Sequence, residues 1–469
     1  MISPIRTEID RVLDLESALN EAIAANLDLA SKNREVAAGT KNISRARSNL
    51  LPQIDINATA FQVDKDRANA SFGSLPERKF SGSVTLTQLI YSNDAWTNPG
   101  IQSALQKSLE QEHVQLRLDI SQEAATAYFQ VLRAKTNERI ERENLQRKRK
   151  NLELARVREA VGYSGRADVY RWESEIATNR SRVITTNSQR NLAEIQLNRL
   201  LHRPSEEAFV TREIDIQDLE ILRKQGPLLK YFESQGAFRT LREFLVHESF
   251  KNSPELHQFD ALIAVQEKAF TSAKRAFWTP TVAVQAELEN TFSKSANGQG
   301  GGDAPIIPGL ETADDLNWTV ALNLSFPLFT SGAKTADRDQ AREELTQVKL
   351  RRESVAERIK QRVRSALHIA GASFAAIKLS QDAATAARQN LDLVVDAYSR
   401  GVLSIIDLID AQNAALVAEQ ASANAVYTFI IDFVEVQRAV GMFHYFMTEQ
   451  ERDEILQRLR AFEEERGNN

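Results

Sequence analysis

The sequence contains two copies of one long unit, and this duplication limits the possible folds more than any other feature. Residues 50–56 (LLPQIDI) of the first copy match residues 277–284 (FWTPTVAV) of the second. Residues 161–169 (VGYSGRADV) align with residues 400–408 (RGVLSIIDL) without a gap. A repeat this long is too large for a solenoid unit. We therefore expect two similar halves that lie side by side in one structural unit with pseudo-twofold symmetry.

Both copies have the same order of expected elements: short helices, a strand, a loop, a second strand, one very long helix, a tight turn and another long helix. This order predicts a mainly α-helical fold with four β-strands in each chain. The expected parts are repeat 1 at 1–204 (strands 53–63 and 80–90, long helical hairpin 94–201), an inter-repeat connector at 205–244, repeat 2 at 245–441 (strands 281–292 and 317–326, long helical hairpin 333–440) and a charged, disordered tail at 442–469.

The longest helices are indicated by narrow apolar stripes. In the first copy, Leu105, Leu109, Leu116, Ile120 and Ala124 recur at spacings of 3, 4 or 7 residues, as on one side of an α-helix. Glycine and proline are scarce, with 18 and 11 residues respectively, so little interrupts these helices. A helix of this length is on the order of 100 Å long. Small residues on the stripe favour coiled-coil-like antiparallel pairs.

The strands show strict alternation of apolar and polar residues. Trp318, Val320 and Leu322 alternate with polar residues such as Thr319 and Asn323. Such alternation predicts a sheet with one apolar and one polar face. A strand of a soluble β-sandwich would have the same pattern, so the alternation alone does not choose between a membrane sheet and a sandwich.

The composition excludes several classes of function. The net charge of −5 argues against a general nucleic-acid binder. Cysteine is absent, which excludes disulfides, thiolate metal sites and cysteine nucleophiles. The six histidines are scattered without metal-ligand spacing. We expect no enzymatic activity, no metal and no cofactor.

No apolar run is long enough for a transmembrane helix. Residues 1–10 contain no apolar segment of the kind found in a secretory signal, so we expect no signal peptide in this sequence.

Four strands form an open sheet with two unpaired edges. If the apolar face contacts lipid, these edges cannot stay open, because nothing in the bilayer satisfies their backbone groups. Two chains would give eight strands around an interior filled by side chains, whereas three would give twelve strands around an aqueous lumen. The expected strands are about ten residues long, which suits a tilted membrane strand.

Aromatic residues gather where the strands meet the helices, at one expected face of the membrane. They resemble half of the aromatic girdle of a membrane sheet. A hydrophobic plug between helices and sheet is the alternative. These residues are Tyr91, Phe277, Trp278, Phe326 and Phe329.

The duplicated order of elements resembles the TolC family of outer-membrane efflux proteins. The resemblance also covers residues 50–54 (LLPQI), 326–332 (FPLFTSG), 398–401 (YSRG) and 404–411 (SIIDLIDA). It implies a homotrimer with a twelve-stranded barrel in the outer membrane and a twelve-helix tunnel across the periplasm of a Gram-negative bacterium. It also implies passive export, in which a periplasmic adaptor joins the channel to an inner-membrane pump of the RND, ABC or MFS type, for efflux or type I secretion.

Two carboxylates are candidates for a pore constriction. Asp407 and Asp410 are three residues apart, so they share one face of a helix near its start. The resemblance places both at the periplasmic end of the tunnel, where three chains would bring six carboxylates together and form a gate. Ser404 followed by Asp407 also fits a helix-capping pattern, and the two roles are compatible.

The first copy differs at the equivalent positions, where Asp168 corresponds to Asp407 and Arg171 to Asp410. By resemblance, Tyr398 helps to hold neighbouring hairpins closed, and Asp168 is a candidate acceptor for its hydroxyl. The alternatives are an Asp168–Arg171 pair across an interface, or a solvated tyrosine and aspartate at a helix end.

The two helical hairpins each close through a short turn, with glycine ending one helix and serine beginning the next. As simple connectors these turns need no further role. By resemblance they are the tips that contact the adaptor. The residues are Val161, Gly162, Tyr163 and Ser164 in the first copy and Gly401, Val402, Leu403 and Ser404 in the second.

The sequence therefore predicts a trimeric outer-membrane channel. The competing hypothesis is a soluble coiled-coil scaffold, in the periplasm or the cytoplasm, whose strands form a small sandwich without channel activity.

Overall fold

A computed structural model describes residues 12–71, 75–211, 226–295, 314–443 and 447–467. The chain forms two compact units. Unit 1 contains Met1–Asn33, Glu112–Leu256 and Glu353–Asn469, and unit 2 contains Arg34–Gln111 and His257–Arg352. The division does not follow the repeats, because each unit takes segments from both copies of the sequence.

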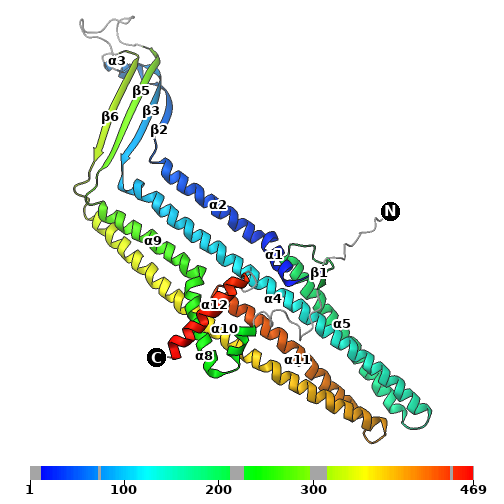
Figure 1. Ribbon diagram of the computed structural model, residues 1–469. Helices are drawn as coiled ribbons and strands as arrows, with labels where there is room; N and C mark the ends of the chain where they lie inside the picture. The colour runs from blue at the N-terminus through cyan, green and yellow to red at the C-terminus, as the bar shows by residue number, and fades with distance from the viewer. Residues whose placement is uncertain (1–11, 72–74, 212–225, 296–313, 444–446, 468–469) are drawn as a thin grey trace, which may run out of the picture. The chain divides into compact units, whose positions relative to one another are not determined.

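Unit 2 contains the four-stranded sheet that the sequence predicts (Figure 1). Its strands are β2 (Gln53–Gln62), β3 (Arg78–Tyr91), β5 (Thr281–Ser295) and β6 (Leu316–Ser325). The strand order is β2-β3-β5-β6, and every neighbouring pair is antiparallel. The central β3–β5 pair therefore joins the first copy of the repeat to the second.

The strand register gives the sheet two chemically different faces. Ile54 pairs with Leu86, Leu86 with Ala286 and Ala286 with Val320, so one apolar row crosses all four strands. One residue along each strand, Asp55 pairs with Thr85, Thr85 with Glu287 and Glu287 with Thr319. Because successive side chains point to opposite faces, these polar residues form the other face.

Two helical hairpins follow the strands in the chain. The first consists of α4 (Asn93–Ala160) and α5 (Arg166–Leu200). The second consists of α10 (Ala333–Ser399) and α11 (Ile405–Val440). The predicted mainly helical fold with long duplicated hairpins is confirmed. None of the helices in the described ranges is both long and apolar enough to cross a membrane.

Each strand pair is preceded by two shorter helices, and the junction between these helices is capped in a similar way in both copies of the sequence. The junction lies between α1 (Leu15–Ala25) and α2 (Leu27–Ser48), and again between α8 (Gln235–Asn252) and α9 (Pro254–Arg275). The Asn26 side chain accepts a hydrogen bond from the Leu29 amide, and Ser253 accepts one from the Leu256 amide. Both side chains therefore cap a helix start.

The connector between the repeats contains one short strand and several helical segments. β4 (Val210–Thr211) pairs in parallel with β1 (Val12–Leu13). It is followed by α7 (Gly226–Leu229), the 3-10 helix η1 (Lys230–Phe232) and the start of α8. Phe232 packs against Phe374 and Phe429, with ring centroids 5.5 and 6.1 Å apart respectively. This aromatic cluster fixes η1 against the helices of unit 1.

The expectation of a disordered C-terminal tail is wrong over α12 (Glu449–Gly467). Ile455 and Leu459 are fully or almost fully buried, because their spacing of four residues gives the helix one apolar side. Arg458 donates to Glu248 of α8 at 2.8 Å, so a charged contact adds to this packing. Residues 444–446 and 468–469 of the expected tail lie outside the described residues.

A buried cluster of charges joins four helices of unit 1. Arg438 of α11 is 5% exposed and donates hydrogen bonds to Asp119 of α4 and to Glu255 of α9. Arg362 of α10 also donates to Glu255, at 3.1 Å. Burial alone raises the pKa of the Glu255 carboxyl, but Arg438, the Ser253 hydroxyl and Arg362 outweigh burial and lower the pKa to about 2.

We predict that this cluster makes the stability of the protein depend on acidic pH. A carboxyl group whose pKa is lowered on folding stabilises the protein above its ordinary pKa, and this stability is lost as the pH falls toward the folded value. From the pKa shift of Glu255 to about 2, the contribution is up to about 3 kcal/mol before solvent screening. The melting temperature of Glu255→Gln, measured by circular dichroism in detergent, should therefore fall less than that of the unsubstituted protein between neutral pH and pH 3.

Glu353→Gln is the matched control, because Glu353 lies exposed on a helix of the same unit. Identical pH profiles for the unsubstituted protein and Glu255→Gln would contradict the prediction.

Candidate functional site

The turn of the first hairpin is fixed by hydrogen bonds to the end of α4. Gly162 has a φ of +76°, a left-handed conformation that suits glycine. Its amide donates to the Glu159 carbonyl at 3.0 Å, and the Tyr163 amide donates to the Arg158 carbonyl at 2.8 Å. This pair of bonds ends a helix in the Schellman manner.

The start of α5 differs from the sequence-based prediction. Gly165, and not Ser164, is the N-cap residue, and it has no side chain that could cap the helix. The Ser164 hydroxyl is buried and has no hydrogen-bond partner among the described residues. The prediction that serine begins the second helix is therefore wrong for the first hairpin.

In the second hairpin, α10 ends in the same way as α4, but α11 begins differently from α5. Gly401 has a φ of +77°, and the Val402 amide donates to the Ala397 carbonyl at 2.9 Å. Ser404 then forms a capping box with Asp407 at the start of α11. The Ser404 amide and hydroxyl donate to Asp407 Oδ2 at 2.9 and 2.6 Å respectively. These hydrogen bonds hold the pKa of the Asp407 carboxyl below its usual range.

Asp410 lies one turn further along α11 and is exposed, as is Asp407. Neither carboxylate forms a salt bridge within the part of the chain that the structure describes. The two negative charges therefore face solvent within a single chain. This arrangement can attract cations wherever several copies come together.

Within one chain, Asp168 of the first copy lies near Tyr398 of the second, but no hydrogen bond joins the two side chains among the described residues. Tyr398 is buried, and its hydroxyl has no hydrogen-bond partner among the described residues. Burial raises the pKa of the Tyr398 phenol, and the negative charge of Asp168 raises it further. Asp168 is half-buried and Arg171 is exposed, and no ion pair joins these two side chains.

The contact between Arg158 and Tyr398 at the hairpin ends was not predicted from the sequence. The Arg158 guanidinium donates to the Tyr398 carbonyl at 2.9 Å and lies 4.5 Å from the centroid of the Tyr398 ring. It therefore joins the last turn of α4 to the last turn of α10. Its position four residues before Gly162 marks it as a cation near a helix end, but nothing in the sequence identifies its partner.

An apolar core lies beneath this contact and includes residues of both hairpins. Trp172 of α5 is fully buried in a cluster with Leu152 of α4 and with Leu408 and Ile409 of α11. Large apolar side chains of this kind each contribute about 1.5–3 kcal/mol when buried. The ends of the two hairpins are therefore packed together within one chain.

The turns themselves expose apolar side chains beyond this core. Tyr163 is 75% exposed and Val402 is 74% exposed, and Val161 is exposed to a similar extent. Leu403 is less exposed than these three. Apolar exposure at two adjacent turns is typical of a contact surface for a partner.

The sheet of unit 2 exposes apolar side chains along one face. Ile56 is 79% exposed, Trp318 75% and Leu322 68%. β2 and β6 form the outer edges of this sheet, and neither has a second neighbouring strand within the described residues. An exposed apolar face of this kind is typical of a surface that contacts another apolar surface. The open edges can pair with further strands.

The five predicted interface aromatics flank the same end of the sheet. Tyr91 is the last residue of β3, Trp278 lies just before β5, and Phe326 directly follows β6. Phe277 and Phe326 lie near the cations of Arg338 and Lys334, at 5.8 and 4.9 Å from the ring centroids. Trp278 and Phe329 are highly exposed.

The family is decided by a match to the outer membrane efflux protein family over residues 18–202 and 245–442. The chain belongs to this family. Its sequence is 22% identical over 450 residues to the outer membrane protein TolC of Escherichia coli, and the match covers 93% of this chain and 83% of TolC.

Two solved structures show the same fold. A membrane protein from Pseudomonas aeruginosa superposes with a TM-score of 0.73 at 17% identity, over 92% of this chain and 93% of that protein. The outer membrane protein VceC from Vibrio cholerae superposes with a TM-score of 0.70 at 17% identity, over 91% of this chain and 96% of VceC.

Membership of the outer membrane efflux family establishes the general function. The protein is an outer-membrane efflux channel, and this family transports molecules without enzymatic chemistry. The exposed sheet and the helical hairpins are therefore parts of a transport protein of the outer membrane.

We predict that Arg158→Gln loosens the end of the second hairpin. Removing a charged donor from the Tyr398 carbonyl should cost on the order of 1 kcal/mol at this half-buried site, which corresponds to roughly fivefold more frequent local opening. The Gly401 and Val402 amides, which donate to the last turn of α10, should then exchange with deuterium faster, as measured by mass spectrometry.

Arg156→Gln is the control for this experiment. Arg156 lies on the same helix but forms only exposed pairs with Glu153 and Glu173. Equal exchange in both variants would show that Arg158 does not stabilise the turn.

Proposed function

We propose that three copies of this chain form the exit duct of a tripartite efflux pump or a type I secretion system. In this assembly, twelve strands enclose an aqueous lumen in the outer membrane, and twelve helices form a tunnel that extends into the periplasm. Transport through the duct is passive, and an inner-membrane pump joined by a periplasmic adaptor supplies the energy.

The observation that carries this proposal is the exposed apolar face between two open sheet edges. The edge strands β2 and β6 can pair with the β6 and β2 of neighbouring copies, which would satisfy their backbone groups in lipid. The apolar row that includes Ile54 and Val320 would face lipid, and the polar row that includes Asp55 and Glu287 would face the lumen. Three copies give a lumen, whereas two copies would be filled by side chains.

The aromatic residues at the end of the sheet fit the membrane boundary in this arrangement. Indole and phenol rings favour the level of the lipid headgroups. Tyr91, Phe277, Trp278, Phe326 and Phe329 would form the periplasmic side of an aromatic girdle.

We further propose that Asp407 and Asp410 form the constriction at the periplasmic end of the tunnel. Both are exposed and lie on consecutive turns at the start of α11. Three chains would bring six carboxylates around one axis, where the ring would attract cations and repel anions. Asp168, Arg171 and Tyr398 would stabilise the closed arrangement through contacts around this ring.

Replacing both carboxylates tests the constriction. The double variant Asp407→Asn/Asp410→Asn should show higher single-channel conductance in planar bilayers and weaker block by multivalent cations, because the negative ring is lost. The single change Asp410→Asn separates the ring from the capping box, since Asp407 belongs to both and Asp410 only to the ring.

Ser404→Ala is the control, because it removes the capping hydroxyl without changing charge. If the double variant conducts and is blocked like the unsubstituted channel, the gate lies at other residues.

The hairpin turns are proposed as the surface that contacts the adaptor. Val161, Tyr163 and Val402 are exposed apolar residues beside turns that hydrogen bonds hold in one conformation. Gly162 and Gly401 adopt the left-handed conformation that these turns require. Ser164, Leu403 and Ser404 are the remaining residues of the proposed contact surface. A partner that buries these apolar side chains would gain about 25 cal/mol for each Å² removed from water.

A charge on this surface should prevent coupling to the pump. Val402→Glu is expected to abolish export in cells while trimers still form in outer-membrane extracts, because a buried unpaired carboxylate opposes docking. Leu379→Glu is the control, since Leu379 is also highly exposed but lies far along α10 from the turn. Loss of trimers in Val402→Glu would refute the contact role.

A further inference from the structure

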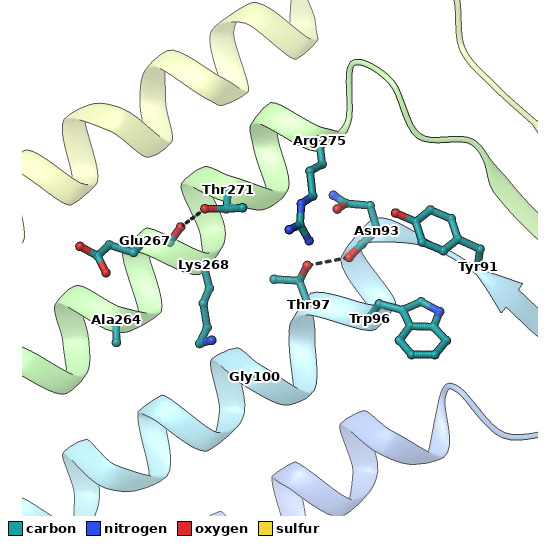
Figure 2. Close-up of a pocket in the computed structure, with 10 residues that line it drawn as sticks. All are labelled: Tyr91, Asn93, Trp96, Thr97, Gly100, Ala264, Glu267, Lys268, Thr271 and Arg275. Atoms are coloured by element: carbon teal, nitrogen blue, oxygen red, sulfur yellow. Dashed lines mark hydrogen bonds between the residues drawn. The ribbon is translucent and has the colours of Figure 1, made fainter.

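Unit 2 contains a cavity of about 590 Å³ that the transport mechanism does not use (Figure 2). It lies between the first turns of α4 and the last turns of α9, where these helices adjoin the central strands β3 and β5. Because copies would pair through the outer strands β2 and β6, the cavity is complete within one chain.

Two exposed cations line this cavity without an acidic partner in the part of the chain that the structure describes. Lys268 and Arg275 reach from α9 toward α4 (Figure 2). Neither forms a salt bridge with a described residue. The Nζ atom of Lys268 lies 3.5 Å from the point that a Cβ atom would occupy if Gly100 of α4 carried a side chain. Its ammonium group therefore lies between the two helices.

Three other polar side chains of the lining already have partners. The Thr97 hydroxyl donates to the Asn93 carbonyl at 2.8 Å, and the Thr271 hydroxyl donates to the Glu267 carbonyl at 2.7 Å. The Glu267 carboxylate also borders the cavity, but it faces the ammonium group of Lys349 at 4.0 Å. Lys268 and Arg275 are the lining cations that form no salt bridge with a described residue, so the cavity favours an anion. The first turn of α4 adds the positive end of a helix.

The strand register indicates on which side of the sheet the cavity opens. Tyr91 lines the cavity and pairs with Val282 across the β3–β5 ladder, and Val282 pairs with Leu324. Directly paired residues share one face of a sheet, so Tyr91 belongs to the apolar face. Trp96 also lines the cavity and is 57% exposed. An anion in this cavity would therefore lie beside an apolar surface and two aromatic rings.

We propose that this cavity binds the phosphate headgroup of an anionic phospholipid, with Lys268 and Arg275 as its ligands. The lipid acyl chains would lie against the apolar face of the sheet beyond Tyr91. This assignment rests on the proposed function, which places this end of the sheet at the periplasmic boundary of the outer membrane. A free phosphate ion would also satisfy the two cations, so the experiment has to distinguish a lipid headgroup from inorganic phosphate.

Native mass spectrometry of the full-length protein tests this site, because it counts chains and bound lipids in the same spectrum. The protein is reconstituted with phosphatidylglycerol and phosphatidylethanolamine and then returned to detergent. Retention of phosphatidylglycerol by Lys268→Gln/Arg275→Gln should fall roughly tenfold or more, since each basic residue near a membrane surface contributes appreciably to anionic lipid binding. An excess of inorganic phosphate should not displace the lipid from the unsubstituted protein.

Lys274→Gln/Arg342→Gln is the matched control. It removes the same charge from the same unit, but both side chains lie over the Phe270 ring outside the cavity. Equal retention by the two double variants, or displacement by inorganic phosphate, would overturn the lipid site. An unsubstituted particle that does not contain three chains would instead overturn the proposed function.

Discussion

The backbone hydrogen bonding of the sheet is the constraint on which the rest of this protein depends. Within one chain, β3 and β5 have partners on both sides, while β2 and β6 each have one open edge among the described residues. In water such edges are solvated, but in lipid every unpaired amide and carbonyl costs several kcal/mol. The apolar face that includes Ile56 and Trp318 is exposed in the same sheet. In the proposed assembly, pairing with other chains would satisfy the two edges.

The duplication explains why one chain can supply two equivalent hairpins, and the differences between the copies explain why they are not interchangeable. Both hairpins end one helix at a left-handed glycine, Gly162 or Gly401. Only the second copy begins its next helix with a capping box, and only that copy has two exposed carboxylates at this point. The two repeats therefore share a backbone arrangement, but only the second repeat carries the pair of aspartates at the start of its second long helix.

Within one chain, contacts between the two sequence repeats occur in both unit 1 and unit 2. In unit 2, the β3–β5 ladder joins the first copy to the second. In unit 1, Arg158 reaches Tyr398, and Arg438 is buried between Asp119 and Glu255. Charged groups are costly to bury without partners, so an arrangement that separated Arg438 from Asp119 and Glu255 would be unfavourable. The lining of the α4–α9 cavity likewise combines residues from both copies.

The sequence by itself determined the long helical hairpins and the four strands of the large sheet, because these elements depend on local periodicity and on turn residues, but it did not predict β1, β4 or α12. The hairpin predicted from residue 333 begins at Ala333, and alternation at Trp318 and Val320 identified the two faces of β6. Only the tertiary structure decided which distant residues meet. It placed β3 beside β5, Arg158 on Tyr398 and α12 against α8, and it left Ser164 out of its expected capping role. Except for the local capping at Ser164, these outcomes depend on packing between segments far apart in the chain, for which spacing along the sequence carries no signal.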